Sequence, residues 1–281
     1  MELILFNPHL RDILRKTATV CIVAKPLKRS MEKMESIVIY DSRPELNRPI
    51  VVEGLPGIGN VGKIAAEYLA EALNAERFAS IYSPDFPPQV LVDEENVADF
   101  ARNELWFAKA KDVDLVFILG DYQGSSSEGQ FLVCKQIIDL LLKYDPVEII
   151  TLGGYGTGTI IETPRVLGAV SKVEVKAAYE KLGVVFEPHE PKGGIAGASA
   201  MFLALGQIYG INSICLMGET AGYFIDHKSA AAIMEILVKK LDVEVDTEEL
   251  DNHSAMIDEL NQKVRELESG RTTEEDLNYF G

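Results

Sequence analysis

The chain has 281 residues, of which 47% are hydrophobic and 25% are charged, and its formal net charge is −17. This length and composition suit one large α/β domain or two small ones. The negative charge argues against nucleic acid and anionic membrane surfaces as partners, and no apolar run approaches the ~20 residues that a membrane span requires.

Residues 1–33 differ in charge from the rest of the chain. They contain seven basic and three acidic residues, a net charge of +4, whereas residues 34–281 contain 20 basic and 41 acidic residues, a net charge of −21. A basic and partly apolar N-terminus is typical of a targeting segment, but this one lacks a small-residue cleavage site after an apolar core. The alternative that we favour is an extension upstream of a start at Met31 or Met34. We expect it to pack poorly against the rest.

The first regular elements follow this extension. The β-branched run 48–54 predicts a buried strand, and the apolar spacing over 60–73 predicts a helix. A second strand is predicted over 77–83, followed by a proline-rich loop. The alternating residues 90–108 predict a small antiparallel excursion of two or three short strands, in which Trp106 packs.

The middle of the chain predicts the centre of a sheet. Residues 112–121 are apolar without interruption, which is typical of a strand buried on both faces. Residues 125–145 predict a helix whose N-cap is a serine and whose first turn contains Glu128. Residues 147–154 predict another strand, which ends in the glycine-rich segment 153–158.

The remaining part of the predicted domain continues the alternation. We expect helices over 173–183, 193–210 and 227–242, and a strand over 211–220. Strands and helices that alternate in this way predict an α/β fold with a doubly wound, mostly parallel sheet. We assign this domain to residues 34–243.

Residues 244–268 predict a C-terminal helix that begins at a capping box. Its apolar side chains repeat every seven residues, and the candidates for a partner-binding stripe are Leu250, Ile257, Leu260, Val264 and Leu267. Such a stripe packs either on its own domain or on a neighbouring chain. Residues 269–281 then predict a flexible polar tail with an aromatic end.

The segment 54–62, "GLPGIGNVG", contains G-x-G-x-x-G at Gly57, Gly59 and Gly62. One interpretation is a dinucleotide site, because a predicted strand precedes the glycines and a predicted helix follows them. Asp85 lies 23 residues beyond Gly62, where an acid would bind the ribose, but prolines surround it and Pro56 lies in the turn itself. The interpretation that we favour is a tight turn that lets the helix approach the sheet.

Catalytic and metal chemistry have little support in the sequence. The three cysteines are far apart, which is typical of a protein of the reducing cytosol. The four histidines are equally scattered, so the sequence predicts no metal site. Segments 54–62, 125–128 and 153–158 fall at predicted strand ends and predict a crevice suited to an anion. No nucleophile and base can be paired there, so we predict no catalytic residue and no cofactor.

Several of these segments together resemble a known family. "VVEGLPGIGNVGKIAAEYL", "SPDFPP", "GGYGTG" and "GIAGASAMFLALGQIYGINSICLMGET" are similar to archaeal members of the PAC2 family, the homologues of proteasome-assembly chaperones. The resemblance runs from about residue 36 to about residue 242. It implies a fold like that of the nucleoside phosphorylases, a homo-oligomer of four or five subunits without enzymatic activity, and a role at the 20S proteasome. A second family member is the alternative partner of the C-terminal helix.

The resemblance also gives the chain end a meaning. Proteasome-binding proteins of this kind end in a hydrophobic residue, a tyrosine and any residue, and this chain ends in Tyr279, Phe280 and Gly281. Phe280 takes the tyrosine position without its hydroxyl group. The resemblance therefore implies that the tail binds the proteasome α-ring, and the alternative is a chance aromatic ending.

Overall fold

The computed structural model describes residues 36–245. The basic N-terminal extension, nearly all of the predicted C-terminal helix with its stripe from Leu250 to Leu267, and the tail with Tyr279, Phe280 and Gly281 lie outside the described residues. Predictions about those segments, and the predicted domain boundaries, therefore stay predictions.

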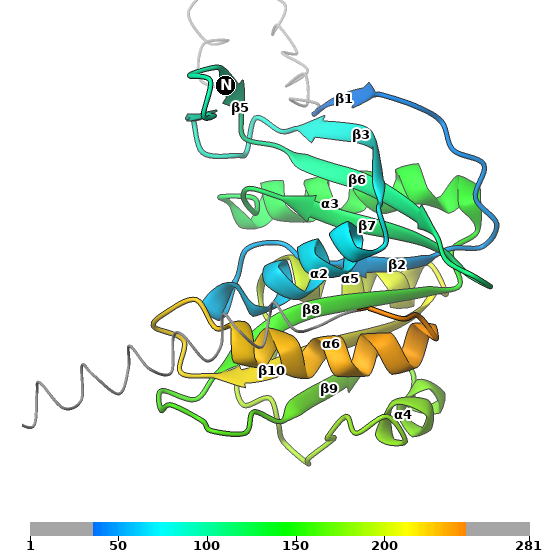
Figure 1. The fold of residues 1–281 in the computed structure, drawn as a ribbon, viewed down its shortest axis with the longest axis vertical. Helices are drawn as coiled ribbons and strands as arrows, with labels where there is room; N and C mark the ends of the chain where they lie inside the picture. Colours follow the sequence, from blue (N-terminus) through cyan, green and yellow to red (C-terminus); the bar gives the residue numbers. More distant parts are fainter. Residues whose placement is uncertain (1–35, 246–281) are drawn as a thin grey trace, which may run out of the picture. The chain divides into compact units, whose positions relative to one another are not determined.

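The described residues form one eight-stranded sheet in the order β1-β3-β6-β7-β2-β8-β10-β9 (Figure 1). The strands are β1 (Ile37–Tyr40), β2 (Ile50–Glu53), β3 (Glu76–Tyr82), β6 (Asn103–Lys109), β7 (Asp114–Gly120), β8 (Glu148–Gly156), β9 (Val166–Val170) and β10 (Asn212–Thr220). The central strands β7, β2, β8 and β10 pair in parallel. Antiparallel pairs extend the sheet on both sides, and β3 shares the direction of the central four. The α/β class with a mostly parallel sheet is confirmed.

Helices cover both faces of this sheet, as the doubly wound prediction requires. They are α2 (Val61–Ala72), α3 (Ser127–Leu141), α4 (Val173–Glu180), α5 (Gly197–Ile208) and α6 (His227–Leu241). Helices α2 and α6 lie together on one face, and α3 and α5 lie together on the other (Figure 1). Two hydrophobic cores result, one on each side of the sheet.

Strand β7 shows why the sheet is buried at its centre. Leu115, Phe117 and Leu119 belong to the core under α2 and α6, whereas Val116 and Ile118 belong to the core under α3 and α5. Successive strand residues point to opposite faces, so an uninterrupted apolar run supplies both cores. Each large side chain buried in this way contributes about 1.5–3 kcal/mol.

Helix α3 begins where its sequence predicts. The Oγ atom of Ser126 accepts a hydrogen bond from the Gly129 amide at 3.0 Å, and Glu128 lies in the first turn. The serine satisfies an amide that has no partner within the helix, and the carboxylate interacts favourably with the positive end of the helix dipole. The predicted N-cap is confirmed.

Three predictions need correction. Strands β4 (Val90–Val92) and β5 (Ala98–Phe100) do form a small hairpin, but Trp106 lies on β6, which pairs with β3 and β7 in the main sheet. Strands β1 and β9 were not predicted. The glycines of segment 153–156 are strand residues of β8 that pair with β10, rather than a turn. In each case the decisive contact is with a strand far away in sequence.

Candidate functional site

The glycine motif forms a tight turn between β2 and α2. Gly59 has φ +63°, a left-handed conformation that favours glycine, and a Cβ atom on Gly62 would lie 2.2 Å from the Leu152 carbonyl oxygen of β8. Gly57 is extended, with φ −155°, and a Cβ atom there would meet no atom closer than 3.9 Å. Backbone conformation and close packing therefore account for Gly59 and Gly62.

The chain segment after β10 packs against this turn. The Asp226 amide donates a hydrogen bond to the Gly59 carbonyl oxygen at 2.9 Å, and the Thr220 hydroxyl donates to the Asp226 carboxylate at 2.6 Å. A Cβ atom on Gly154 would lie 2.3 Å from the Ile58 carbonyl oxygen. The turn is thus held from both β8 and β10 by the protein's own backbone.

Asp85 lies at a different place from the one that a ribose site requires. Its carboxylate accepts hydrogen bonds from the Ser126 amide at 3.1 Å and from the Ser126 hydroxyl at 2.7 Å, at the N-terminus of α3. Asp85 is therefore a second cap of α3. The sequence distance from Gly62 suggested a partner of the glycine turn, and the structure shows a partner of the next helix instead.

A glutamine side chain bridges two segments at the predicted crevice. The structure brings segments 54–62 and 153–158 together, because Ile58 packs against Gly154, whereas segment 125–128 begins α3 beside Asp85. The Gln123 side chain donates to the Pro56 carbonyl oxygen at 2.6 Å and accepts from the Ala198 amide at 2.8 Å. An amide at the N-terminus of α5, the kind of donor that an anion would use, is therefore occupied.

Glu53, the last residue of β2, is a buried carboxyl group that the sequence analysis missed. It accepts hydrogen bonds from the Leu55 amide at 3.1 Å and from the Ser199 hydroxyl at 2.9 Å. Burial is the largest cause of its pKa shift and raises the pKa to about 7. Its position between an apolar run and a glycine was the only available signal.

The groups around Glu53 are poorly suited to nucleophilic chemistry. Burial raises the pKa of the Cys215 thiol to about 12 and also raises the pKa of the Cys134 thiol, so both stay protonated near neutral pH. The Ser199 hydroxyl is also 3.1 Å from the Leu152 carbonyl oxygen, which competes for its single proton. Glu53, Ser199 and the two thiols therefore form a packed group at the strand ends rather than a catalytic one.

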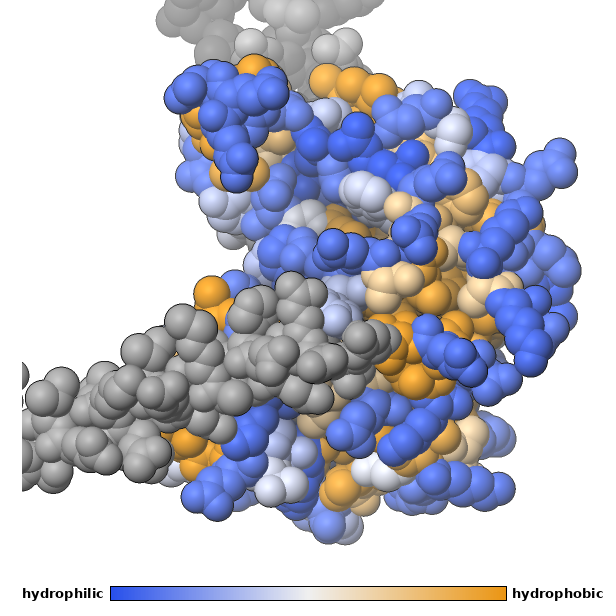
Figure 2. All heavy atoms as spheres, viewed as in Figure 1, coloured by the Kyte–Doolittle hydropathy of each residue, from blue (hydrophilic) through white to orange (hydrophobic). Residues whose placement is uncertain are grey.

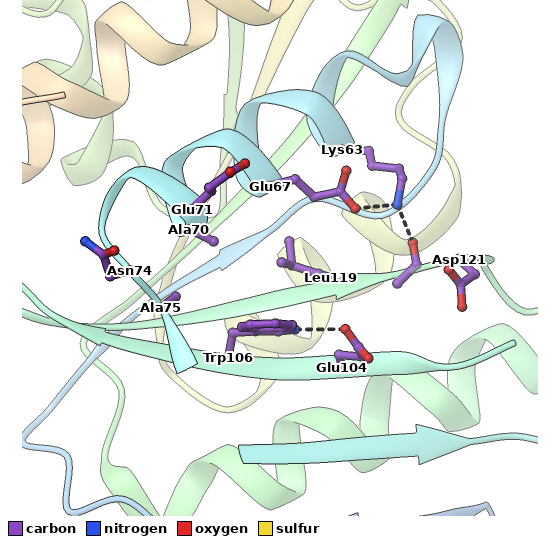
Figure 3. A pocket seen from close by; sticks show the side chains of 11 residues that line it. Lys63, Glu67, Ala70, Glu71, Asn74, Ala75, Glu104, Trp106, Leu119 and Asp121 are labelled. Carbon is purple, nitrogen blue, oxygen red and sulfur yellow. Dashed lines mark hydrogen bonds and ion pairs between the residues drawn. The ribbon is translucent and has the colours of Figure 1, made fainter. Parts of the chain in front are cut away.

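A second region of interest is a pocket of about 550 Å³ between α2 and strands β6 and β7 (Figure 3). The Trp106 indole nitrogen donates to Glu104 at 2.9 Å, and Lys63 pairs with Glu67 and donates to the Gly120 carbonyl oxygen at 3.0 Å. Burial opposes ionisation of Glu104, but hydrogen bonds from arginine side chains and from Trp106 outweigh it and lower its pKa.

The composition of this pocket favours binding over catalysis. Its eleven lining residues are Lys63, Glu67, Ala70, Glu71, Asn74, Ala75, Glu104, Trp106, Leu119, Gly120 and Asp121. They include no serine, threonine, cysteine, histidine or tyrosine. Of the groups that could serve in acid–base chemistry, Lys63 is paired with Glu67, and Glu104 accepts hydrogen bonds from Arg77, Arg102 and Trp106. An indole and small aliphatic side chains among carboxylates form a surface for contact with another molecule.

Within residues 36–245, no three His, Cys, Asp or Glu side chains gather where they could hold a metal ion. Among the described helices, none is both long and apolar enough to cross a bilayer.

Comparison with known proteins gives the family. The model of the PAC2 family matches residues 51–265, which is most of the chain. The chain belongs to the PAC2 family. The resemblance that the glycine-rich segments carry in the sequence is thereby confirmed.

Relatives of this PAC2 protein match it over nearly their whole length. It is 33% identical to the uncharacterized protein MJ1210 of Methanocaldococcus jannaschii, over 89% of this chain and 99% of the relative. Among solved structures, PbaB of Pyrococcus furiosus, described as an archaeal proteasome activator, is 36% identical with a TM-score of 0.79, over 83% of this chain and 99% of PbaB. PbaA of the same organism, described as an archaeal homolog of proteasome-assembly chaperone, is 28% identical with a TM-score of 0.68, over 86% and 97%.

Proposed function

We propose that this PAC2 protein is a non-enzymatic, homo-oligomeric chaperone or adaptor that binds the α-ring of the 20S proteasome in the cytoplasm. The observation that carries the proposal is the 36% identity to the archaeal proteasome activator PbaB over 99% of that protein's length. Identity at this level over a whole chain is evidence for a shared role, whereas a shared fold alone is not.

The strand ends support the non-enzymatic part of the proposal. Gln123 occupies the α5 amide, and the carboxyl group of Glu53 is hydrogen-bonded to neutral groups. The buried thiols of Cys134 and Cys215 are held protonated. Folds of this kind bind their substrates at the carboxyl ends of the strands. In this protein the polar groups there make hydrogen bonds that stabilise the protein itself.

The proposed contact with the proteasome is the chain end. Tyr279 and Phe280 supply aromatic surface for a cleft between α-ring subunits, and the carboxylate of Gly281 supplies a charge for a lysine there. A single short tail binds weakly. An oligomer presents several tails at once, which raises the overall affinity by about 10²–10⁴ if their spacing matches the ring.

Co-elution with 20S particles tests the proposal. The full chain should elute with the proteasome, and removal of residues 279–281 should abolish this. A matched control removes residues 271–273 from the same polar segment and leaves the final tripeptide in place. Binding that survives loss of the tripeptide, or that is lost equally in the control, would remove the tail from the mechanism.

The stripe Leu250, Ile257, Leu260, Val264 and Leu267 is proposed as a contact with another chain, either a second copy or another PAC2 protein. Truncation at Asp246 tests it. Because this truncation also removes residues 279–281, the proposal requires the loss of a complex that a chain lacking only residues 279–281 keeps, and it fails if no such complex is lost.

A further inference from the structure

Strand β1 is one edge of the main sheet, and within the described part of the chain it pairs on one side only, with β3. Ile37 is 63% exposed and Ile39 is 51% exposed. Figure 2 shows hydrophobic atoms at the top of the view, where Figure 1 places β1. An exposed apolar edge with unpaired backbone groups is a template for pairing with another strand.

An acidic and apolar hairpin stands at one end of this edge. Ile37 pairs with Tyr82, the last residue of β3, and the β4–β5 hairpin leaves the sheet just beyond it. Residues 88–100 are all exposed. Val92 and Phe100, 61% and 68% exposed, lie on one face of the hairpin together with Val90 and Ala98.

The two ends of the edge carry opposite charge. The hairpin turn contains Asp93, Glu94 and Glu95. At the other end, the Arg43 guanidinium carbon is 5.3 Å from the centre of the Tyr40 ring, and the Lys143 amine is 5.5 Å from it. Asp41 also lies at this end, but its carboxylate pairs with the Arg77 guanidinium at 2.8 Å. The surface therefore runs from acidic, through apolar, to basic along one strand.

We propose that this edge is a subunit interface, at which the β1 strands of two copies pair antiparallel about a two-fold axis. The inference rests on the homo-oligomer of the proposed function and selects four subunits over five, because two-fold pairs give an even number of subunits. Antiparallel pairing places the acidic hairpin of each copy beside Arg43 and Lys143 of the other, whereas parallel pairing would bring like charges together. In the register that pairs Ile37 of one copy with Ile39 of the other, it also places these isoleucines of both copies on one shared face of a continuous sheet.

Self-complementarity is the reason for assigning a second copy rather than another protein. A two-fold interface requires one surface to carry both halves of each contact. This edge carries acidic and basic side chains, exposed apolar side chains, and a strand that pairs on one side only among the described residues. The apolar face of the hairpin gains cover at the same time. An isolated two-stranded hairpin is marginally stable in water, so cover from a partner stabilises it.

The first test measures the mass of the full chain in solution by light scattering. Val92→Lys with Phe100→Lys, which brings like charges beside Arg43 and Lys143 of the other copy, should yield a species of half the wild-type mass or less. Val173→Lys is the matched control, because Val173 is 79% exposed on α4, away from the edge. Circular dichroism shows that each variant is folded. A wild-type monomer, an unchanged mass in the double variant, or an equal loss in the control would overturn the proposal.

The second test reverses the charges. Arg43→Glu with Lys143→Glu should raise the dissociation constant of the pair by roughly tenfold. Adding Glu94→Lys and Glu95→Lys to that variant should restore it. Rescue supports the antiparallel arrangement, and failure of rescue in a folded protein overturns it.

This interface can fail separately from the proposed function, because the mass measurements need no proteasome. A chain that lacks residues 279–281 should keep its oligomeric mass while it loses the proteasome. A chain with the hairpin substitutions should keep the tail but bind more weakly, because fewer tails act together.

Discussion

Two glutamates are buried at opposite ends of the central parallel strands, and they are compensated differently. Glu148 begins β8, where the Lys240 amine lies 2.7 Å from one carboxylate oxygen and the Tyr179 hydroxyl donates to the other at 3.0 Å. Glu53 ends β2, where its hydrogen-bond partners are the neutral Leu55 amide and Ser199 hydroxyl. The amino end of β8 holds a buried ion pair, and the carboxyl end of β2 holds a carboxyl group that protonates near neutral pH. A third buried glutamate, Glu219 near the end of β10, pairs with Arg165.

This difference bears on function because α/β folds bind their ligands at the carboxyl ends of the strands. A ligand site there usually presents free donors or charges to the ligand. Here the polar side chains of Gln123 and Ser199 are already hydrogen-bonded to the protein itself, so they are not free to bind a ligand. Contacts with partners are expected at the edge strand and the chain end instead.

Loss of the cation at the amino end should have the largest effect. Lys240→Met leaves the Glu148 carboxylate buried without its partner, and we expect the free energy of unfolding to fall by about 3 kcal/mol, since Lys240 is partly exposed. Urea denaturation measures this. Lys239→Met is the control, because Lys239 pairs with Glu235 at the surface and should cost under about 0.5 kcal/mol. Equal effects in the two variants would contradict the distinction.

The buried carboxyl group of Glu53 should make the free energy of unfolding depend on pH. The pKa of Glu53 is raised from 4.5 to about 7, so the folded state binds more protons than the unfolded state between these values. The contribution of Glu53 to the free energy of unfolding is therefore fully present below about pH 4.5 and falls as the pH rises through 7. At pH 8, Glu53→Gln should be more stable than wild type by about 2 kcal/mol.

Denaturation at several pH values measures this advantage, which should shrink toward pH 5. Glu235→Gln, at an exposed position, is the control and should leave the profile unchanged. A Glu53→Gln variant with the wild-type pH profile would show that Glu53 does not titrate in this range.

The bridge made by Gln123 should have a smaller effect. Gln123→Ala removes hydrogen bonds to Pro56 and Ala198, and we expect a loss of about 1 kcal/mol in the free energy of unfolding. Gln207→Ala is the control, because the exposed Gln207 side chain donates to the Ser171 carbonyl oxygen at 3.2 Å and should contribute a few tenths of a kcal/mol. If both substitutions cost the same, Gln123 has no special role at the crevice.

Added nucleotides should have the smallest effect, because we expect none of them to bind. We expect no heat of binding and no thermal shift with NAD, FAD, ATP or nucleosides, because Gly59 and Gly62 serve the turn and Gln123 occupies the α5 amide. Isothermal calorimetry on the full chain measures this. Saturable heat with any of these ligands would restore the glycine motif as a cofactor site.

The elements predicted from sequence are those whose local pattern is sufficient. Strand β7 has an unbroken apolar run, and α2 and α6 have apolar residues at helical spacing. Strands β1 and β9 are short edge strands whose pairing depends on residues about 40 positions away, so no local pattern identifies them. The prediction that Trp106 packs in the small hairpin was wrong for the same reason, because the partners of β6 are distant in sequence.

The site was less predictable than the fold. The glycine turn could be predicted because glycine at a strand-to-helix junction has a backbone meaning of its own. The burial of Glu53, the Gln123 bridge and the change of partner at Asp85 each depend on an element distant in sequence. Spacing along the chain does not identify such partners.

We propose that this protein acts through its chain end on the proteasome rather than through the carboxyl ends of its strands. The most direct measurement is the affinity of the full chain for purified 20S proteasome, compared with Phe280→Ala and Phe280→Tyr. We predict saturable binding that Phe280→Ala weakens by at least tenfold and that Phe280→Tyr, which supplies the hydroxyl group, strengthens. Equal affinity in all three, or no binding by the full chain, would contradict the account.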